Sequence, residues 1–274
     1  MKIGIIGGTG GMGSLFSQVF KAAGHEVLIS GRSTELKKED IARLADIVII
    51  SVPIRDTIQV IDAIVPLLGS HQILADFTSL KTEPVKAMLN SCSRVIGFHP
   101  MFGPTSGTIH GQTIIATPAR CDEEDIRFFE VIFEGQGARV TRTTPEEHDR
   151  MMAVIQGLTH FKAILLAGTM RRLGISPADT ERYMSPVYRI ETGIAGRLLA
   201  QDPELYADIL CMNPCVPSVL KEFEKAAGEI LTMITDGDRE AFTAEFLASR
   251  EWFGIFCIQA QKETDLLIHA MVNQ

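Results

Sequence analysis

The stretch Lys2-Ile3-Gly4-Ile5-Ile6-Gly7-Gly8-Thr9-Gly10-Gly11-Met12-Gly13 decides the fold of this chain. It begins with the continuous apolar pattern of a buried strand, and apolar residues at helical spacing follow it to about Ala23. Gly8, Gly10 and Gly13 match the dinucleotide fingerprint, which needs a tight turn, a close approach of backbone to a pyrophosphate, and close packing of helix on strand. The helix amino terminus supplies N–H groups to the anion. The stretch therefore predicts a dinucleotide-binding domain whose cofactor contacts include Thr9, Gly11 and Met12.

The residues after the second predicted strand, 26–29, bear on which dinucleotide binds. A fold that prefers NAD usually carries an acidic side chain at the end of this strand, where it hydrogen-bonds the ribose 2′-hydroxyl. Here Ser30, Arg32 and Ser33 offer hydroxyls and a guanidinium instead, which suit a 2′-phosphate. The pattern favours NADP. NAD remains the alternative, with Arg32 stacked beside the adenine or lying in solvent.

Strands and helices continue to alternate as far as about Thr141. We expect strands at 46–51, 72–76, 94–98, 113–116 and 138–141, and helices at 35–44, 57–68, 82–90 and 123–134. This alternation predicts a Rossmann-type, doubly wound and mostly parallel sheet in residues 1–143. Its carboxyl edge, where such sheets bind cofactor and substrate, receives Ser51 with Val52 and Pro53, then Ser79, then His99. Ser79 has helix capping as an equally good explanation.

His99 opens an ordered loop, Pro100-Met101-Phe102-Gly103-Pro104-Thr105-Ser106-Gly107, directly after a short apolar run. An unperturbed imidazole titrates near pH ~6.5, so it can exchange protons under cellular conditions. Capping of the strand end is the commoner role for such a histidine. Its position at the sheet edge nevertheless makes His99 the leading candidate for a catalytic base.

No further strand is predicted after Thr144. Helix starts are marked instead by a capping residue followed by proline, at Thr144-Pro145, Ser176-Pro177, Ser185-Pro186 and Asp202-Pro203. We expect residues 144–274 to form an all-helical domain that binds substrate. Long segments at 145–173, 214–235 and 238–272 are richer in Leu, Ile, Met and Phe than a domain of this size can bury alone, which predicts a homodimer.

Three features of the helical half bear chemistry. Gln156 and His160 are four residues apart and share one helix face. Arg189 and Arg197 are eight apart with small residues between them, which indicates either a cleft for a carboxylate ligand or two surface salt bridges. His148 falls near a helix start, where a capping or interdomain hydrogen bond is the more common role.

Composition limits the remaining classes of function. At 274 residues, 46% of them hydrophobic, the chain has material for two ordinary cores, and its net charge of −8 argues against a nucleic-acid surface. The longest apolar stretch, Ile47 to Pro53, is too short to span a bilayer, and nothing resembles a signal peptide. Five scattered cysteines fit reduced thiols, and no ligand cluster completes a metal site. We therefore expect a cytoplasmic protein with no metal, nucleic-acid or membrane partner.

Several long motifs in this chain resemble the prephenate dehydrogenase family, and most closely the dehydrogenase part of the bacterial bifunctional chorismate mutase/prephenate dehydrogenase. They cover essentially the whole chain and comprise residues 8–16, Ser51-Val52-Pro53-Ile54, His99-Pro100-Met101-Phe102-Gly103-Pro104, Glu147-His148-Asp149, 185–191, 196–209 and Trp252-Phe253-Gly254. Two departures stand out. No mutase domain precedes Met1, so a monofunctional enzyme is expected, and residues 30–33 lack the acid of the bifunctional relative, which prefers NAD.

The resemblance implies NAD(P)-dependent oxidative decarboxylation of prephenate to 4-hydroxyphenylpyruvate in tyrosine biosynthesis. It implies that His99 takes the proton of the ring hydroxyl, that Ser79 orients this histidine, and that Arg197 binds the ring carboxylate. Arg189 would support the pocket, and His160 with Gln156 would line the substrate side chain. Arogenate is the alternative substrate. A dinucleotide-sensing regulator without turnover is the alternative from another class, although the His99 loop and the arginine pair argue against it.

Overall fold

The computed structural model describes residues 1–273, which belong to two compact units. The amino-terminal unit comprises Met1–Ala153 together with Ala207–Pro214, and the helical unit comprises Val154–Tyr206 and Cys215–Gln274.

The amino-terminal unit is built on a seven-stranded sheet with the order β2-β1-β3-β4-β5-β6-β7. β1 to β5 are mutually parallel, β6 is antiparallel to β5, and β7 runs parallel to β6. The order reverses at β1, and this switch point is where open α/β sheets bind ligands, outside the carboxyl ends of the strands. The strands are β1 Lys2–Ile6, β2 Glu26–Ser30, β3 Ile47–Ile50, β4 Ile73–Asp76, β5 Arg94–Pro100, β6 Thr113–Arg120 and β7 Arg139–Arg142.

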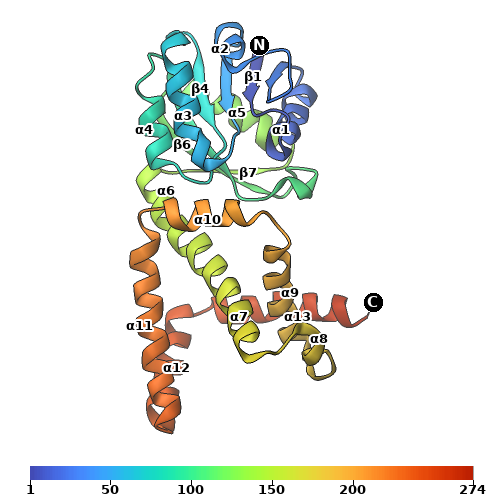
Figure 1. Cartoon of the computed structure of the whole chain (residues 1–274), viewed down its shortest axis with the longest axis vertical. Helices are drawn as coiled ribbons and strands as arrows, with labels where there is room; N and C mark the ends of the chain where they lie inside the picture. Colours follow the sequence, from blue (N-terminus) through green and yellow to red (C-terminus); the bar gives the residue numbers. More distant parts are fainter. Residues whose placement is uncertain (274) are drawn as a thin grey trace. The chain divides into compact units, whose positions relative to one another are not determined.

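Helices cover both faces of this sheet (Figure 1). On one face, phenylalanines of α1 (Gly11–Ala22) and α5 (Glu123–Gly135) pack on residues such as Ile5 and Phe98. On the other, apolar residues of α2 (Lys38–Leu44), α3 (Ile54–Ile64) and α4 (Thr82–Met88) pack on Val48 and Leu74. β-branched and aromatic side chains on both faces explain why the strands read as continuous apolar runs. The predicted doubly wound, mostly parallel sheet is confirmed.

Some element ends differ from the sequence-based expectation. β5 continues to Pro100, so His99 lies within the strand rather than after it. The extension has a physical cause, because β6 runs antiparallel to β5 and pairs Ile115 with His99 and Ile114 with Pro100. α3 begins at Ile54, directly after Pro53, and a short 3-10 turn, Val65–Leu67, follows it.

The chain after Thr144 is helical throughout its described part. Four helices begin at the prolines that the cap-then-proline pattern marks: α6, α8, α9 and α10. In the first three, the side chain of Thr144, Ser176 or Ser185 accepts a backbone N–H of the first turn, as a helix cap should. The helices are α6 Pro145–Met152, α7 Thr159–Leu173, α8 Pro177–Thr180, α9 Pro186–Leu199, α10 Pro203–Met212, α11 Val216–Thr235, α12 Arg239–Phe253 and α13 Phe256–Val272.

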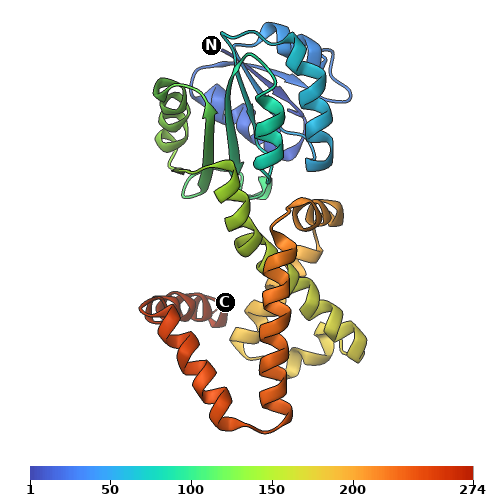
Figure 2. The same ribbon diagram turned by 90° about the vertical axis from the view of Figure 1, so that its left-hand side faces the viewer.

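Two interruptions in the long helices were not predicted. A π-helical segment, Ala153–Leu158, joins α6 to α7. Gly254, with a φ of +55°, separates α12 from α13 inside the segment expected to be one helix, because few residues other than glycine adopt this backbone angle. Figure 2 shows α11 and α12 as the two arms of a helical hairpin.

Two segments beyond residue 143 belong to the amino-terminal unit by their contacts. The Asp149 carboxylate in α6 accepts the backbone N–H groups of Lys81 and Thr82 at 2.8 and 2.9 Å. The Asn213 side chain, just after α10, donates to the Asp149 carbonyl at 2.9 Å. These hydrogen bonds hold α6 and residues 207–214 against the start of α4.

Among residues 1–273, the helix spanning Pro145–Leu173 is long and apolar enough to cross a membrane by length and composition alone. Its most apolar window has a mean hydropathy of 1.4, and 22% of that window is buried. Core helices of soluble proteins pass the same criterion, so this does not by itself identify a membrane segment. The expectation from uninterrupted apolar stretches overlooked this helix.

Candidate active site

The glycine-rich turn joins β1 to α1 as the fingerprint requires. Gly7 has a φ of +87°, and a Cβ on Gly13 would lie 2.4 Å from the Gly7 carbonyl oxygen, so the helix packs directly on the turn. A Cβ on Gly8 would meet the Ile29 side chain at 2.6 Å. A Cβ on Gly10 would lie 3.3 Å from the Gly7 carbonyl oxygen, a tight contact, so the turn favours glycine there as well. No side chain caps α1, so its first N–H groups are available to an anion.

A cavity of about 660 Å³ opens beside this turn within the amino-terminal unit. Its wall includes most of the predicted cofactor residues, namely Thr9, Gly10, Arg32, Ser51, Val52 and Pro53. Lys37 and Lys38 also line it, together with the acids Glu39 and Asp56. The shape of the turn, the uncapped helix and the cavity all fit a dinucleotide. Ser33 is exposed and, with Gly8, Gly11, Met12 and Gly13, lies outside the cavity wall.

A buried ion pair lies at the carboxyl end of β4. The Lys81 ammonium group contacts the Asp76 carboxylate and donates to the Phe98 carbonyl at 2.8 Å, and both side chains are fully buried. Burial lowers the pKa of Lys81, although the negative charge of Asp76 opposes this. The pair ties the loop after β4 to the end of β5, which is the strand that carries His99.

His99 is hydrogen-bonded in a chain of three side chains. Its Nδ1 lies 2.8 Å from Nε2 of His148, and Nδ1 of His148 lies 2.8 Å from Oδ1 of Asp149. All three residues are at most 3% exposed. Within the described residues no hydrogen bond reaches Nε2 of His99, so this nitrogen is the one left for a ligand.

Burial sets the protonation of this chain. It lowers the pKa of His99 well below the ordinary value of 6.5, and the charges of His148 and Lys81 lower it further. Burial also lowers the pKa of His148, against the hydrogen bond to Asp149. Asp149 has a lowered pKa because its hydrogen bonds from His148, Thr82 and Lys81 together outweigh its burial. At neutral pH Asp149 is therefore an ionised carboxylate, and His148 and His99 are neutral imidazoles.

Ser79 lies in the loop between β4 and α4 and is half-buried. Its hydroxyl makes no hydrogen bond to another residue in the part of the chain that the structure describes. It remains a candidate for contact with a ligand, whereas Thr78 and Lys81 beside it are occupied by Asp76.

The helical unit brings two predicted residues, His160 and Arg197, near Tyr206. The rings of His160 and Tyr206 meet edge to face with centroids 4.9 Å apart, and Arg197 is close enough for its charge to oppose the burial that raises the pKa of Tyr206. Gln156 Oε1 and His160 Nδ1 are buried atoms with no hydrogen-bond partner among residues 1–273. Unpartnered buried polar atoms are costly and usually mark a site completed by water or a ligand.

Arg189 and Arg197 both lie on α9 and are exposed. Neither guanidinium forms an ion pair within the described chain, so the surface salt bridges considered from the sequence are absent there. An unpaired arginine beside buried polar atoms suits an anionic ligand.

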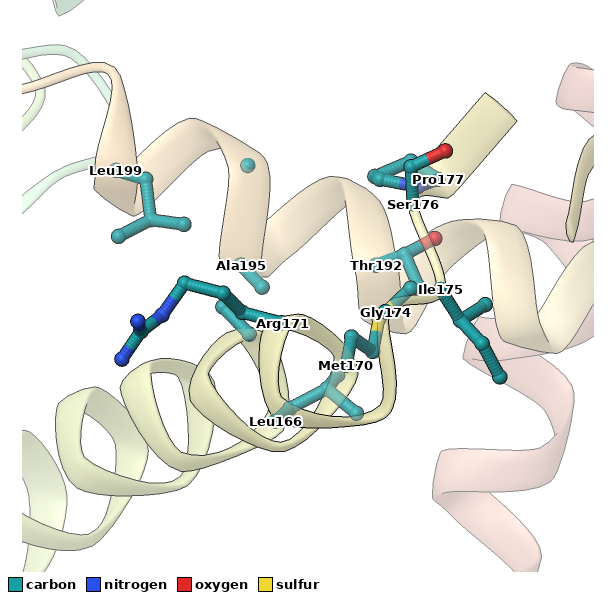
Figure 3. A pocket seen from close by; sticks show the side chains of 12 residues that line it. Leu166, Met170, Arg171, Gly174, Ile175, Ser176, Pro177, Thr192, Ala195 and Leu199 are labelled. Atoms are coloured by element: carbon teal, nitrogen blue, oxygen red, sulfur yellow. The ribbon is translucent and has the colours of Figure 1, made fainter. Parts of the chain in front are cut away.

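A second cavity in the helical unit, of about 470 Å³, lies between α7 and α9 and is mostly apolar. Figure 3 shows Met170, Ile175 and Thr192 around it, with the Arg171 side chain extending toward Leu199. None of the predicted substrate residues lines it.

The sequence reasoning missed four residues of these sites. His148 was given a capping or interdomain role, but it is bonded to His99. Lys81 was interpreted as a capping or surface residue, but it is fully buried and paired with Asp76, and Asp149 and Tyr206 were given no role. The adjacent buried pair His148-Asp149 in a polar helix start was the available signal. The structure contains no group of three or more His, Cys, Asp or Glu suited to a metal ion in residues 1–273.

A nucleotide-binding sheet with an imidazole at its carboxyl edge, followed by a helical unit, defines a dinucleotide-dependent dehydrogenase. Two family models then cover most of the chain: "Prephenate dehydrogenase, nucleotide-binding domain" matches residues 21–142, and "Prephenate dehydrogenase, dimerization domain" matches residues 144–248. The chain belongs to the prephenate dehydrogenase family.

Similar proteins extend over the whole chain. The T-protein of Haemophilus influenzae is 36% identical over 271 residues, covering 97% of this chain and 71% of its own length. A probable arogenate/prephenate dehydrogenase of Methanocaldococcus jannaschii is 33% identical, covering 100% of this chain and 66% of its own length. The chain thus spans about two thirds of the length of these relatives.

Two solved structures share the fold. Prephenate dehydrogenase from A. aeolicus, in complex with hydroxyphenyl propionate and NAD+, has a TM-score of 0.73 at 22% identity, covering 92% of this chain and 96% of that one. Synechocystis arogenate dehydrogenase has a TM-score of 0.71 at 20% identity, covering 92% and 98%.

Proposed function

We propose that this protein catalyses the NAD(P)-dependent oxidative decarboxylation of prephenate to 4-hydroxyphenylpyruvate in the cytoplasm, as a step of tyrosine biosynthesis. The observation that carries the proposal is the buried, neutral His99, whose Nδ1 is bonded to His148 while no group among residues 1–273 is bonded to its Nε2. A neutral imidazole in this state is a base with one lone pair directed at a ligand.

His99 takes the proton of the ring hydroxyl at its Nε2. A dinucleotide held by the glycine turn and the cavity beside it would supply the acceptor for the hydride that leaves the same carbinol carbon. The bond to the ring carboxylate then breaks, carbon dioxide leaves, and the bonding electrons complete the aromatic ring. Burial of His99 keeps water away from the proton transfer.

Arg197 binds the ring carboxylate through charge-assisted hydrogen bonds, and Arg189 supports the same helix. His160 Nδ1 and Gln156 Oε1 contact the polar side chain of the substrate, which explains two buried polar atoms without protein partners. Ser79 contacts the substrate or the nicotinamide beside His99. Prephenate is a dianion, so unpaired guanidinium groups are the side chains that such a ligand needs.

The cofactor is proposed to be NADP, with NAD as the alternative. Arg32, Lys37 and Lys38 line the cavity beside the glycine turn, and Ser30 stands where an acid would bind the ribose of NAD. An Arg32→Asp variant should move the ratio of kcat/KM values toward NAD, while Lys21→Glu, an exposed change on α1 away from the cavity, should not. An unchanged ratio in Arg32→Asp would refute the 2′-phosphate contact.

The direct test of the reaction is absorbance of reduced nicotinamide with prephenate or arogenate crossed with NAD or NADP. Arogenate is the second candidate substrate, favoured by the name of the Methanocaldococcus relative. It carries an amine in place of the keto group. Prephenate turnover is the expected outcome, and no signal with any of the four combinations would overturn the proposal.

We further propose that the helical unit forms a homodimer. Many apolar side chains of this unit are exposed, for example Trp252 at 89% and Leu266 at 72%, and such surface normally marks an interface. The description of the matching family model as a dimerization domain supports this. Sedimentation at micromolar concentration should give a dimer that Phe246→Asp weakens and Leu44→Asp, on α2, does not. A wild-type monomer would refute the dimer.

A further inference from the structure

The chain Asp149, His148, His99 fixes where each proton lies. The Asp149 carboxylate already accepts the N–H groups of Lys81 and Thr82, and its lowered pKa keeps it ionised. An ionised carboxylate only accepts hydrogen bonds, so Nδ1 of His148, at 2.8 Å, must be the donor.

The same reasoning continues to His99. A neutral His148 has one ring proton, and because that proton is on Nδ1, its Nε2 is an acceptor. The Nδ1 of His99 lies 2.8 Å from this Nε2, so it must carry the proton and donate it. His99 therefore has its lone pair on Nε2, the atom that acts as the base in the proposed reaction.

We infer that His148 and Asp149 are positioning residues for the reaction proposed above: they hold His99 in the Nδ1-protonated tautomer and fix the direction of its Nε2 lone pair. The role rests on the proposed function, because a lone pair needs this direction only if it accepts the substrate proton. It goes beyond that function in assigning the orienting groups.

The hydrogen bonds that anchor Asp149 explain why the side chains of Asp149, His148 and His99 can hold fixed orientations. Its carboxylate is bonded to the start of α4, and its carbonyl accepts the Asn213 side chain at 2.9 Å. Two segments of the amino-terminal unit thus fix Asp149, and the side chains of His148 and Asp149 are 0% and 3% exposed. A ring held between two such partners has little rotational freedom.

The charges around His99 explain why the protonated base needs the hydrogen bonds to His148 and Asp149. Once His99 has taken a proton, the cation faces the Lys81 ammonium, which opposes it, although Asp76 pairs with that ammonium. Asp149 is the anion that favours the cation, and it acts through His148. A charge on His148 would lower the pKa of His99, but His148 is neutral at neutral pH, so removing its ring mainly removes the acceptor of the Nδ1 proton. This loss should free His99 to adopt the other tautomer and should weaken it as a base.

The test compares His148→Leu with His148→Gln. Leucine removes the acceptor for Nδ1 of His99, whereas glutamine retains an amide oxygen in its place. The tautomer is read from long-range 1H–15N spectra of 15N-histidine protein without substrate, with His99 assigned by its absence in His99→Asn. We expect the Nδ1-protonated form in the wild type and in His148→Gln, and a shift toward Nε2 protonation in His148→Leu.

Kinetics supply the second readout. In His148→Leu, kcat should fall about 100-fold, a substantial part of what general-base catalysis contributes, and the acid limb of the kcat profile should move to lower pH. KM for the dinucleotide should not change, and His148→Gln should recover much of the lost kcat. A loss of folding rather than of base strength would change all of these together and would not be rescued.

The outcomes separate the two proposals. An Nε2-protonated His99 in the wild type would overturn the positioning role, and this spectrum needs no variant to fold. Unchanged kcat and tautomer in His148→Leu would overturn it as well. A wild type with the Nδ1-protonated tautomer but no turnover of prephenate or arogenate would refute the proposed reaction and leave the hydrogen-bond chain established.

Discussion

The two units of this chain satisfy their polar groups in different ways. In the amino-terminal unit, buried charges and imidazoles pair with one another, as in Lys81 with Asp76 and His99 with His148. In the helical unit, Gln156 Oε1 and His160 Nδ1 are buried without partners in residues 1–273. The amino-terminal unit also has two buried atoms without a partner among residues 1–273, Asp76 Oδ1 and Ser93 Oγ, but the Asp76 carboxylate is paired through its other oxygen. The contrast therefore lies in the paired charges and imidazoles of the first unit, which have no counterpart at Gln156 and His160.

The two units also differ in how far their apolar side chains are buried. Phe16, Phe98 and Phe133 are fully buried in the amino-terminal core, while Trp252 and Leu267 of the helical unit are 89% and 59% exposed. A sheet covered by helices on both faces buries its apolar residues within one chain. The exposed apolar side chains of α11 to α13 are those that the proposed dimer would cover. Under the proposed function, the amino-terminal unit carries the chemistry and the helical unit supplies binding and assembly.

The largest expected effect is a loss of kcat, without a loss of dinucleotide binding, when His99 is replaced. His99→Asn should lower kcat by about 10²–10⁴-fold, the usual contribution of a general base, because asparagine cannot take a proton at the Nε2 position. Steady-state kinetics with saturating cofactor measure this. The Kd for the dinucleotide, from fluorescence titration, should stay within about twofold because the glycine turn is untouched. Near-normal turnover would remove the base assignment.

Arg197→Ala should act on binding instead. A hydrogen bond to a charged group contributes about 1.5–3 kcal/mol, so KM for the substrate should rise about 10- to 100-fold while kcat changes less. Arg182→Ala, another exposed arginine of the helical unit, is the matched control and should leave KM unchanged. An unaltered KM in Arg197→Ala would contradict the proposal that the helical unit binds the substrate. An equal loss of kcat in Arg197→Ala and His99→Asn would contradict the separation of binding and chemistry between the two units.

The fold was predictable because its signals are local. Strand and helix periodicities, the glycine turn and the cap-then-proline pairs each depend on a few neighbouring residues, and the helix starts at Pro145, Pro177, Pro186 and Pro203 were confirmed. The end of β5 was placed too early because pairing with β6, a contact between distant residues, extends it.

The candidate site was less accessible to sequence reasoning. His99 stood out because a loop of glycines and prolines follows it. His148 and Asp149 did not, because their role arises only when α6 packs against β5 and the start of α4. The hydrogen bond His99–His148 joins residues 49 apart in sequence, and Lys81–Asp149 joins residues 68 apart. Tyr206 likewise acquires its neighbours His160 and Arg197 through the packing of α7, α9 and α10.

Two alanine substitutions in the glycine turn should distinguish packing from ligand contact. At Gly13 a Cβ would lie 2.4 Å from backbone, so the turn must shift, which costs about 1–3 kcal/mol and lowers Tm by about 2–4 °C per kcal/mol. At Gly10 a Cβ would lie 3.3 Å from the Gly7 carbonyl oxygen, a tight contact that needs only a small shift, so Tm should fall less than in Gly13→Ala, while the added methyl group should weaken dinucleotide binding. Calorimetry and titration measure both, and equal effects of the two variants would contradict the assignment.

The smallest expected effect is on how the free energy of unfolding depends on pH, and it tests whether the amino-terminal unit holds its buried histidines neutral. His99 and His148 have lowered pKa values in the folded state, so below the ordinary value of 6.5 the unfolded chain binds protons that the folded chain does not. Stability is therefore full above about pH 6.5 and falls as the pH drops, by at most about 1.4 kcal/mol per pH unit for each histidine. Urea unfolding between about pH 7 and 5 measures the slope, to which the half-buried His160 adds in the helical unit. His99→Asn should reduce the slope by up to one proton, and His71→Asn, at an exposed histidine, should serve as the control. An identical slope in His99→Asn and the wild type would mean that His99 takes up its proton inside the folded protein, and the unit would then not hold its base neutral.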